Sequence, residues 1–228
     1  MWRERARQVH VPDGGGVAGV TRRDVRETYE RIAPHFARTR PDPWEEVATF
    51  VSGRTGRTGL DVGTGNGRHA EVLSRACERV LGVDLSHRAL TEAARRARLE
   101  EFVLDLVAAD ATTLPIRDRT VDVAVYVATL HHLPDRALRI ESLNELARVL
   151  RPSGRAIVSA WSVTHDRFDA DAGFDTMLDW TLPDGEVVER FYHIYDGEEF
   201  ASDLDASDLS RTSTFESRGN WYAEVAPE

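Results

Sequence analysis

The sequence predicts an α/β fold in which helices cover both faces of a mainly parallel sheet. Between residues 58 and 161, short apolar runs alternate with helix-forming stretches, and this alternation is typical of parallel strands joined by helices. A glycine-rich loop, 59–67, follows the first apolar run, and Asp84 ends the second. The 228 residues correspond to about one domain. We therefore expect a single domain over residues 21–228, with its ligand at the carboxyl ends of the strands.

The first part of this domain, residues 21–57, is predicted to be a helical cap. Thr21 has the residue type of a helix N-cap, and Pro43 suits the first turn of a second helix. The preceding residues, 1–20, contain three consecutive glycines and little periodicity, which predicts a flexible extension. The helices expected in the cap span 21–38 and 42–53.

The central part, residues 58–161, is predicted to form the cofactor-binding sheet. Its expected strands are 58–62, 79–84, 102–108, 121–127 and 155–161. Its expected helices are 68–76, 86–98 and 135–150, with Ser86 as a cap. The Pro152-Ser153-Gly154 sequence predicts a turn before the last of these strands.

In the last part, residues 162–228, strands and helices no longer alternate, and this part is predicted to form the substrate side and the closing strands. Residues 164–182 are acidic and aromatic, 187–195 favour an extended segment, and 196–204 favour a short helix. Residues 212–218 and 220–226 predict a closing hairpin with Gly219 at its turn.

The glycine loop and the acid that follows it indicate a nucleoside site. Gly63, Gly65 and Gly67 alternate along the loop, so the backbone can turn sharply and approach a ligand closely. Asp84 is placed to accept hydrogen bonds from both hydroxyls of a ribose. A dinucleotide fingerprint is spaced G-x-G-x-x-G and faces a pyrophosphate, which Asp61 would repel. An acid at this position suits a ligand that carries an amino group.

Charge is distributed unevenly along the chain. All 29 basic residues are arginine, and 39 acidic residues bring the net charge to −10. Residues 1–40 carry nine arginines against five acids, whereas residues 161–228 carry four against seventeen. The basic N-terminal part is where an anionic substrate or a nucleic acid would arrive. The acid excess without lysine predicts a protein from a salt-loving organism.

The sequence favours a cytoplasmic protein over a membrane or secreted one. No apolar run approaches the ~18 residues that a membrane-spanning helix needs. Met1 leads into no apolar stretch, so no secretory signal is expected. The single cysteine, Cys77, has no partner for an internal disulfide, and we interpret it as a small core residue in a predicted helix.

Residues 58–161 resemble the class I S-adenosylmethionine-dependent methyltransferases. The resemblance rests on the Asp61-to-Gly67 loop, Asp84, Asp110 after the third strand, the fourth-strand motif 121–125 and the approach to the fifth strand at 146–154. It implies a Rossmann-like fold with a seven-stranded, mostly parallel sheet, an antiparallel closing hairpin, and S-adenosyl-L-methionine as cofactor. The cofactor-binding residues that it implies are Tyr29, Arg40, Asp61, Gly63, Gly65, Gly67, Asp84, Leu85, Asp110, Ala111 and Thr129.

The flanks of this core resemble the tRNA wobble-uridine methyltransferases, which convert 5-carboxymethyluridine to its methyl ester. The matching segments are 29–36, Thr39-Arg40, Pro43-Trp44, Leu130-His131-His132 with Arg139, 189–195 and Asn220-Trp221-Tyr222. The stretch between Trp161 and Glu189 is shorter and more acidic than this resemblance leads us to expect. The implied substrate is the anticodon loop of tRNA, and the implied catalytic residues are His132, Arg190, Tyr192 and His193.

The same resemblance implies a small zinc-binding activator subunit that pairs with the edge strand, Phe102–Ala108. No metal is expected in this chain, because adjacent histidines point in different directions and lack companions at zinc spacing. In an extended segment, Arg190 and Tyr192 would share one face and His193 the other. We therefore do not expect all of these side chains to line one pocket without a bend.

The expected reaction needs little acid–base chemistry. Its nucleophile is a carboxylate with a reference pKa near ~4, so it is ionised at neutral pH. Catalysis then consists mainly of alignment with the methyl group of the cofactor. Three other functions compete with this hypothesis: a methyltransferase for a quinone or other metabolite, an NAD-dependent oxidoreductase, and a non-catalytic cofactor-binding subunit. The spacing of the glycines argues against the oxidoreductase.

Overall fold

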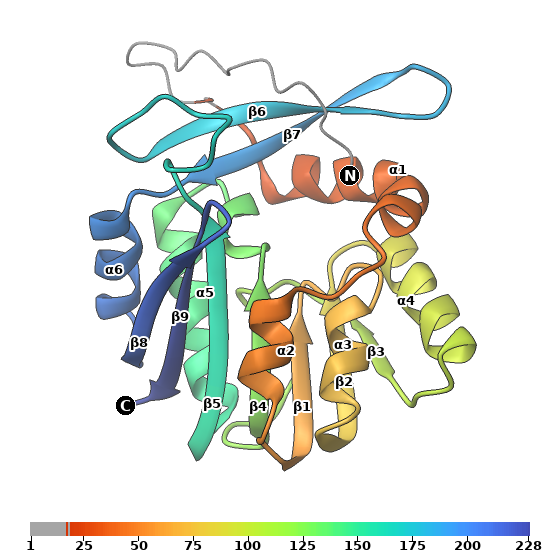
Figure 1. The fold of residues 1–228 in the computed structure, drawn as a ribbon, viewed down its shortest axis with the longest axis vertical. Coiled ribbons are helices and arrows are strands. Elements are labelled where there is room, and N and C mark those ends of the chain that lie inside the picture. The colour runs from red at the N-terminus through yellow and green to blue at the C-terminus, as the bar shows by residue number, and fades with distance from the viewer. Residues whose placement is uncertain (1–16, 18) are drawn as a thin grey trace.

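The computed structural model describes residue 17 and residues 19–228, and it confirms the predicted fold class. A seven-stranded sheet runs in the order β3-β2-β1-β4-β5-β9-β8 (Figure 1), and only β9 runs antiparallel to the other strands. Its strands are β1 Gly56–Val62, β2 Cys77–Asp84, β3 Asp105–Ala108, β4 Val121–Val127, β5 Leu150–Trp161, β8 Leu209–Ser217 and β9 Asn220–Pro227. The helices are α1 Arg22–Thr39, α2 Glu45–Val51, α3 Arg68–Leu73, α4 His87–Leu99, α5 Arg136–Val149 and α6 Gly197–Asp205, with a 3-10 turn η1 at Leu130–His132.

Alternate residues of the central strand β4 face two separate cores. Val123 and Val125 pack in one core with α2 and α3. Ala124 and Tyr126 pack in the other core with α5 and α6. Burial on both sides explains why β4 is an almost continuous apolar run, as is typical of parallel strands between two helical layers.

Helix α1 lies above the carboxyl ends of the strands (Figure 1). Thr21 and Asp24 form a capping box: the Asp24 carboxylate accepts a hydrogen bond from the Thr21 backbone N–H at 2.8 Å, and the Thr21 hydroxyl accepts one from the Asp24 N–H at 3.3 Å. The helix is anchored to α4, because the Glu30 carboxylate accepts the His87 backbone N–H at 2.7 Å. The predicted cap of this helix is confirmed.

A second sheet, which the sequence did not predict, lies beyond α1. It pairs β6 Phe174–Thr181 with β7 Val187–Ile194 in antiparallel register. The chain leaves the main sheet at Trp161 and comes back beside the end of β5 at Tyr195, where the Tyr195 N–H donates to the Trp161 carbonyl at 2.9 Å. The predicted extended segment 187–195 is therefore a paired strand whose partner lies in the acidic, aromatic stretch.

Several predicted boundaries are wrong. The helix expected over 68–76 ends at Leu73, so Cys77 begins β2 and is not helical; it is nevertheless a buried core residue. The second helix begins at Glu45 rather than at Asp42. The Pro152-Ser153-Gly154 sequence forms no separate turn, because it is an irregularity within β5, where the register with β4 shifts.

The edge strand is also shorter than the predicted Phe102–Ala108. It begins at Asp105, because Phe102 and Leu104 instead pack into the core formed with α2 and α3. Val103 lies between them and is 75% exposed. The apolar residues of this stretch are therefore divided between a buried core and the surface.

The closing hairpin is confirmed as β8 and β9. Arg218 and Gly219 form its turn with φ of +51° and +72°. Two consecutive positive φ angles are those of a two-residue type I′ turn, for which glycine is favoured. The predicted extension 1–20 falls mostly outside the described residues, and no helix of the described part is long and apolar enough to cross a membrane.

Candidate active site

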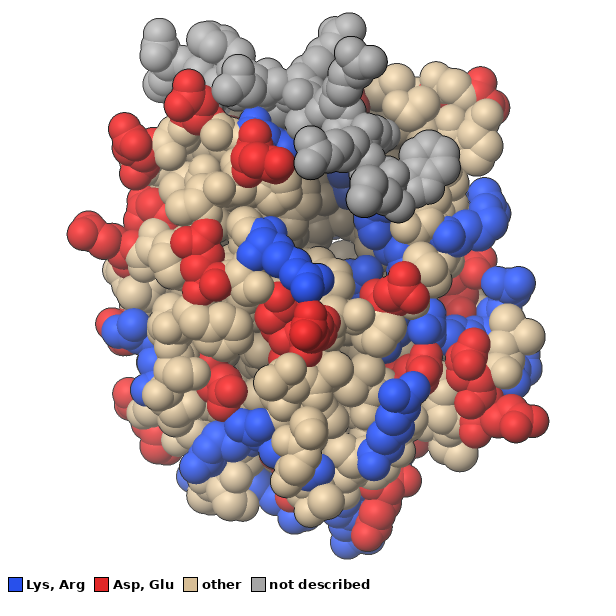
Figure 2. Space-filling model, in the orientation of Figure 1, with Lys and Arg blue, Asp and Glu red and all other residues tan. Residues whose placement is uncertain are grey.

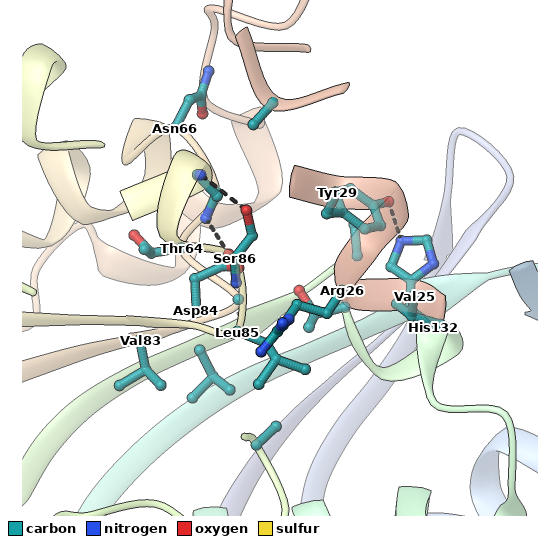
Figure 3. Close-up of a pocket in the computed structure, with 18 of the residues that line it drawn as sticks. Val25, Arg26, Tyr29, Thr64, Asn66, Val83, Asp84, Leu85, Ser86 and His132 are labelled. Carbon is teal, nitrogen blue, oxygen red and sulfur yellow. Dashed lines mark hydrogen bonds between the residues drawn. The ribbon is translucent and has the colours of Figure 1, made fainter. Parts of the chain in front are cut away.

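A cavity lies where the carboxyl ends of β1, β2 and β4 meet α1 (Figure 3). The loops after these strands form its floor and walls, and α1 forms its roof. The following predicted site residues line it: Tyr29, Gly63, Gly65, Asp84, Leu85, Asp110, Ala111, Thr129 and His132. The cavity is therefore at the edge of the sheet where the sequence places the ligand.

The glycine loop forms the floor of the cavity through its backbone. Gly63 has a φ of +69°, and a Cβ atom there would overlap the side chain of Thr129. The N–H groups of Gly63 and Thr64 donate to the Val83 carbonyl at 2.8 and 2.9 Å. These bonds fix the loop against β2, so glycine is required at position 63 both for its conformation and for its lack of volume.

Two carboxylates at the strand ends are held in fixed orientations. Asp84 accepts the Gly65 N–H on one oxygen and the Ser86 N–H on the other, both at 2.9 Å. Burial raises the pKa of Asp84 above its ordinary value, and these backbone bonds oppose the rise. Asp110 accepts the Arg22 guanidinium at 2.8 Å. Both carboxylates line the cavity, where their remaining lone pairs can accept from a ligand.

Asp61 lies beneath the glycine loop and does not line the cavity. Its side chain is 1% exposed and accepts the Thr64 hydroxyl at 2.8 Å. Burial raises the pKa of Asp61 to about 7. Gly67 also lies outside the cavity lining, with a φ of +78°. A Cβ atom there would approach Ala93 to 3.3 Å, so this glycine serves the packing of α3 against α4.

Arg68 lines the same end of the cavity and follows the last glycine directly. It is buried, and burial lowers its pKa to about 10. Its guanidinium lies over the rings of Phe36 and Trp44 at 5.9 and 5.2 Å, and no carboxylate of the described residues lies within 4.0 Å of it. A buried cation that faces a cavity and has no carboxylate at ion-pair distance can bind an anionic ligand group.

Tyr29 and His132 form a hydrogen-bonded pair across the cavity (Figure 3). The His132 Nδ1 atom lies 2.9 Å from the Phe191 carbonyl oxygen, which only accepts, so Nδ1 carries the proton. The Nε2 atom then accepts from the Tyr29 hydroxyl at 2.6 Å. Burial lowers the pKa of His132 to about 3, and the imidazole is neutral at physiological pH.

Arg190 and Tyr192, on β7, are buried behind this pair, and neither lines the cavity. The Arg190 guanidinium donates to the Tyr192 hydroxyl at 2.5 Å and lies 4.6 Å from the centre of the Trp180 ring. Burial and the neighbouring Tyr192 raise the pKa of Tyr29 well above its ordinary value, while Arg190 opposes the rise. The Tyr29 side chain therefore connects the cavity with the arginine of the second sheet.

Two further predicted site residues lie away from the cavity. His193 points to the opposite face of β7, as alternation along a strand requires, and contacts Asp175 and Glu199. Arg40 is exposed at the end of α1 and does not line the cavity; its guanidinium lies 5.3 Å from the centre of the Trp180 ring. Only its backbone carbonyl reaches the loop, where it accepts from the Asn66 amide at 2.9 Å.

Comparison with known proteins agrees with this geometry. The family described as "Methyltransferase domain" matches residues 60–158, which comprise the glycine loop, both strand-end acids and β4. Among solved structures, the fold is similar to the CcbJ methyltransferase from Streptomyces caelestis, with a TM-score of 0.70 at 18% identity over 88% of this chain and 98% of that one. A complex titled "DhpI-SAM-HEP" has a TM-score of 0.69 at 21% identity, over 91% and 100% of the two chains.

Residues 60–158 carry a methyltransferase domain, and the chain has the fold of the class I S-adenosylmethionine-dependent methyltransferases.

Relatives of this methyltransferase share a more specific name. It is 31% identical to a tRNA (carboxymethyluridine(34)-5-O)-methyltransferase of Arabidopsis thaliana, over 75% of this chain and 39% of that protein. It is 32% identical to the Saccharomyces cerevisiae protein of the same name, over 70% and 57% of the two chains. It is 23% identical to the Schizosaccharomyces pombe protein, over 87% and 93%. The methyltransferase thus spans between about a third and three fifths of the length of the first two.

Two residues at or beside the cavity were not predicted from the sequence. Arg68 follows Gly67 directly, so its place at the helix start next to the loop was a usable signal. Trp180 is the ring on which both Arg40 and Arg190 lie, but it belongs to a strand that the sequence did not predict. In the described part of the chain, no three His, Cys, Asp or Glu side chains are grouped to hold a metal ion.

Proposed function

We propose that this methyltransferase forms the methyl ester of 5-carboxymethyluridine at the wobble position of tRNA. The relatives named above support this proposal, and so do the matching segments on the substrate side of the chain. The proposed substrate is the anticodon loop, and the group that receives the methyl is the carboxylate on the uracil ring.

Arg190 is the observation that carries the proposal. It is 6% exposed, and no carboxylate of the described residues lies within 4.0 Å of its guanidinium. A buried charge is costly unless it is paired, so Arg190 lacks a partner that a ligand would supply. A guanidinium presents a planar fork of N–H donors that matches a carboxylate. An anionic substrate group of this shape is therefore the ligand expected beside Arg190.

The hydrogen-bonding and charged groups at the glycine-loop end of the cavity match the groups of the cofactor. In this proposal, Asp84 accepts from the ribose hydroxyls, while Asp110 and the backbone of Ala111 meet the adenine. Arg68 replaces Arg40 as the partner of the methionine carboxylate, because Arg68 lines the cavity and Arg40 does not. When bound, S-adenosylmethionine supplies an electrophilic methyl group on a sulfonium.

The protein's own part in the reaction is to orient the nucleophile. Arg190 and the Tyr192 hydroxyl hold the substrate carboxylate, and one of its oxygens attacks the methyl carbon as the bond from methyl to sulfur breaks. No proton is transferred, which agrees with a neutral His132 whose pKa is too low for it to act as an acid. His132 instead orients the Tyr29 hydroxyl at the boundary between the two ligands.

The test uses anticodon stem-loops that differ in one group. We expect the purified protein to methylate a stem-loop carrying 5-carboxymethyluridine and to leave the 5-carbamoylmethyl analogue unmodified, as detected by mass spectrometry of the nucleosides. Arg190→Met should lower kcat/KM about 100-fold, because removing one partner of a buried charge pair costs about 3 kcal/mol. Arg57→Met, which removes an arginine outside the cavity, is the control. Equal methylation of both stem-loops would overturn the proposal.

A small carboxylate-bearing metabolite is the competing substrate. Arg190 would bind such a carboxylate equally well, and the structural relatives show only the fold. The same assay with free 5-carboxymethyluridine nucleoside separates the two. We expect turnover of the stem-loop to exceed that of the nucleoside by at least about tenfold, because contacts with the rest of the RNA contribute binding energy.

The edge of the sheet at β3 is where we propose that an activator subunit pairs. β3 is an edge strand, and Val103 and Leu99 beside it are the most exposed large apolar side chains of the described residues. Such an edge is a template for strand pairing with a second chain. Val103→Asp should reduce co-purification with a small zinc-binding subunit. Full activity and stability of the protein alone would contradict the need for it.

The surface charge supports a cytoplasmic enzyme that works in high salt. A net charge of −10 opposes RNA binding, but salt screens this repulsion, the Debye length falling to ~3 Å at 1 M. Acidic side chains are spread over both sides of the face in Figure 2. We expect thermal stability and activity to rise with KCl concentration; full activity at low salt would argue against this adaptation.

A further inference from the structure

The face of β7 that points away from the cavity carries a buried histidine between two carboxylates. His193 Nδ1 lies 2.7 Å from Asp175 Oδ1, on the paired strand β6. Its Nε2 lies 2.9 Å from Glu199 Oε1, on α6. The Nδ1 contact is a hydrogen bond, so Nδ1 carries a proton, whereas Nε2 approaches Glu199 without the geometry of a hydrogen bond. Carboxylates on both sides of the ring favour its positive charge. The arrangement fits an imidazolium, unlike the neutral His132 on the other face.

This histidine completes a cluster of charges behind β7. Arg139, on α5, lies 3.6 Å from Glu199 and 3.5 Å from Asp203. Arg136 pairs with Asp203 at 2.6 Å. Asp203 is fully buried and also accepts the Tyr195 hydroxyl at 3.0 Å. The three carboxylates of the cluster, on Asp175, Glu199 and Asp203, are matched by three cations only when His193 is protonated.

The cluster contacts both elements that position the proposed substrate-binding residues, β7 and the η1 turn. β7 carries Arg190 and Tyr192 on its other face, and its Phe191 carbonyl accepts from His132. Arg139 also donates to the Leu133 carbonyl at 3.4 Å, in the residue that follows His132. β6, β7, α5, α6 and the η1 turn therefore meet at one charge-balanced group.

We infer that His193 is a positioning residue whose protonated ring locks β7 against α6, and that losing this proton releases the strand that carries Arg190. This inference rests on the proposed function for its effect on turnover, but not for its effect on the structure. Loss of the proton leaves one half-buried carboxylate charge, on Asp175 or Glu199, without its partner, and this weakens the packing of β7 against α6. The substrate side would then loosen while the cofactor side stays ordered.

The groups facing His193 set the direction of its titration. Burial lowers the pKa of His193, but Asp175 and Glu199 raise it and prevail, while Arg139 opposes them; the pKa lies above its ordinary value. The neighbouring Tyr195 ring is uncharged at these pH values, since burial raises its own pKa. A histidine with a raised pKa stabilises the fold at low pH, and this contribution is lost as pH rises through that pKa.

The first test does not depend on activity. In protein with labelled histidine rings, NMR titration should show one ring, absent from His193→Gln, with a pKa above the ordinary ~6.5. Asp175→Asn should lower that pKa by removing one carboxylate. A His193 ring that titrates below the ordinary value, or that does not respond to Asp175→Asn, would overturn the inference.

The second test connects the proton to turnover. We expect kcat/KM for the stem-loop to fall at alkaline pH with the pKa of His193, whereas affinity for S-adenosylhomocysteine stays constant. His193→Gln, which cannot be protonated, should lower kcat/KM about tenfold below that pH and lose the alkaline fall. His165→Gln, at a half-buried histidine outside the cluster, should keep the wild-type profile. An unchanged alkaline fall in His193→Gln would overturn the inference.

The two proposals fail in different ways. If no stem-loop is methylated, the proposed function fails, and the NMR titration still decides the state of His193. If methylation proceeds but the His193→Gln profile matches that of the wild type, the positioning role fails and the proposed function stands.

Discussion

The two ends of the cavity are built in different ways. The cofactor end is made from the backbone of one loop and from acids at the tips of adjacent strands, all within residues 60–111. The proposed substrate side is made from side chains of α1, η1, β6 and β7, which are far apart in the chain, and its β6 and β7 residues lie behind the cavity lining. The difference teaches that the cofactor end depends on local conformation, whereas the substrate end depends on the packing of distant elements.

Gly63→Ala should give the largest effect and remove the cofactor end alone. The new Cβ would overlap Thr129, and its φ of +69° disfavours alanine. We expect affinity for S-adenosylhomocysteine, measured by calorimetry, to fall about 100-fold, which corresponds to about 2.7 kcal/mol. Gly53→Ala is the matched control, because Gly53 has a φ of +77° with open space around it. Equal affinity for S-adenosylhomocysteine in both variants would contradict the role of the glycine loop at this end of the cavity.

Asp84→Asn should have the next largest effect on the same end. Hydrogen bonds to a charged group contribute about 1.5–3 kcal/mol, so we expect affinity for S-adenosylhomocysteine to fall about 10- to 100-fold. Burial raises the pKa of Asp84, so the wild-type carboxylate gains a proton at a higher pH than usual and affinity should weaken on acidification. The variant should lose that pH dependence. Asp166→Asn, at an exposed acid, should bind like the wild type.

Tyr29→Phe should show to which of the two ends Tyr29 belongs. The change removes the hydroxyl that donates to His132 but keeps the aromatic ring against Phe36. One neutral hydrogen bond contributes about 0.5–1.5 kcal/mol, so kcat should fall about 2- to 10-fold while cofactor affinity changes little. A larger loss of cofactor affinity than of kcat, in single-turnover and calorimetric measurements, would assign Tyr29 to the cofactor end.

Asp61→Asn should have the smallest effect, on stability. Because burial raises the pKa of Asp61 to about 7, the wild-type fold disfavours its charge and loses stability as pH rises between about 4 and 7. The variant cannot ionise and should be more stable than the wild type above pH 7, by on the order of 1 kcal/mol in chemical unfolding. A wild type that gains stability over this pH range would contradict the assignment.

The cofactor end could be predicted from the sequence because its signals are local. Gly63, Asp84 and Asp110 lie next to strands whose apolar runs are themselves readable, and parallel strands bring their carboxyl ends to one edge. Asp61 shows the limit of such reading: its position before the glycines suggested a ligand contact, but its side chain turns beneath the loop.

The substrate end could be predicted only in part. Alternation along β7 correctly separated Arg190 and Tyr192 from His193. The partner strand β6 was missed because its acidic residues conceal the alternation of buried Thr176, Leu178 and Trp180 with exposed or half-buried neighbours. Without β6, neither the ring beneath Arg190 nor the partner of His193 could be identified, since both contacts join residues that are distant in the chain.

The two ends of the segment that carries β6 and β7 lie next to each other. Trp161 and Tyr195 are hydrogen-bonded to each other, so the segment begins and ends at one point beside the carboxyl end of β5. An insertion with adjacent ends can be lengthened, shortened or exchanged with little entropic cost to the fold that hosts it. A methyltransferase core of this kind can therefore acquire a different methyl acceptor by replacing one segment, and chimaeras joined at these two residues offer a direct route to altered specificity.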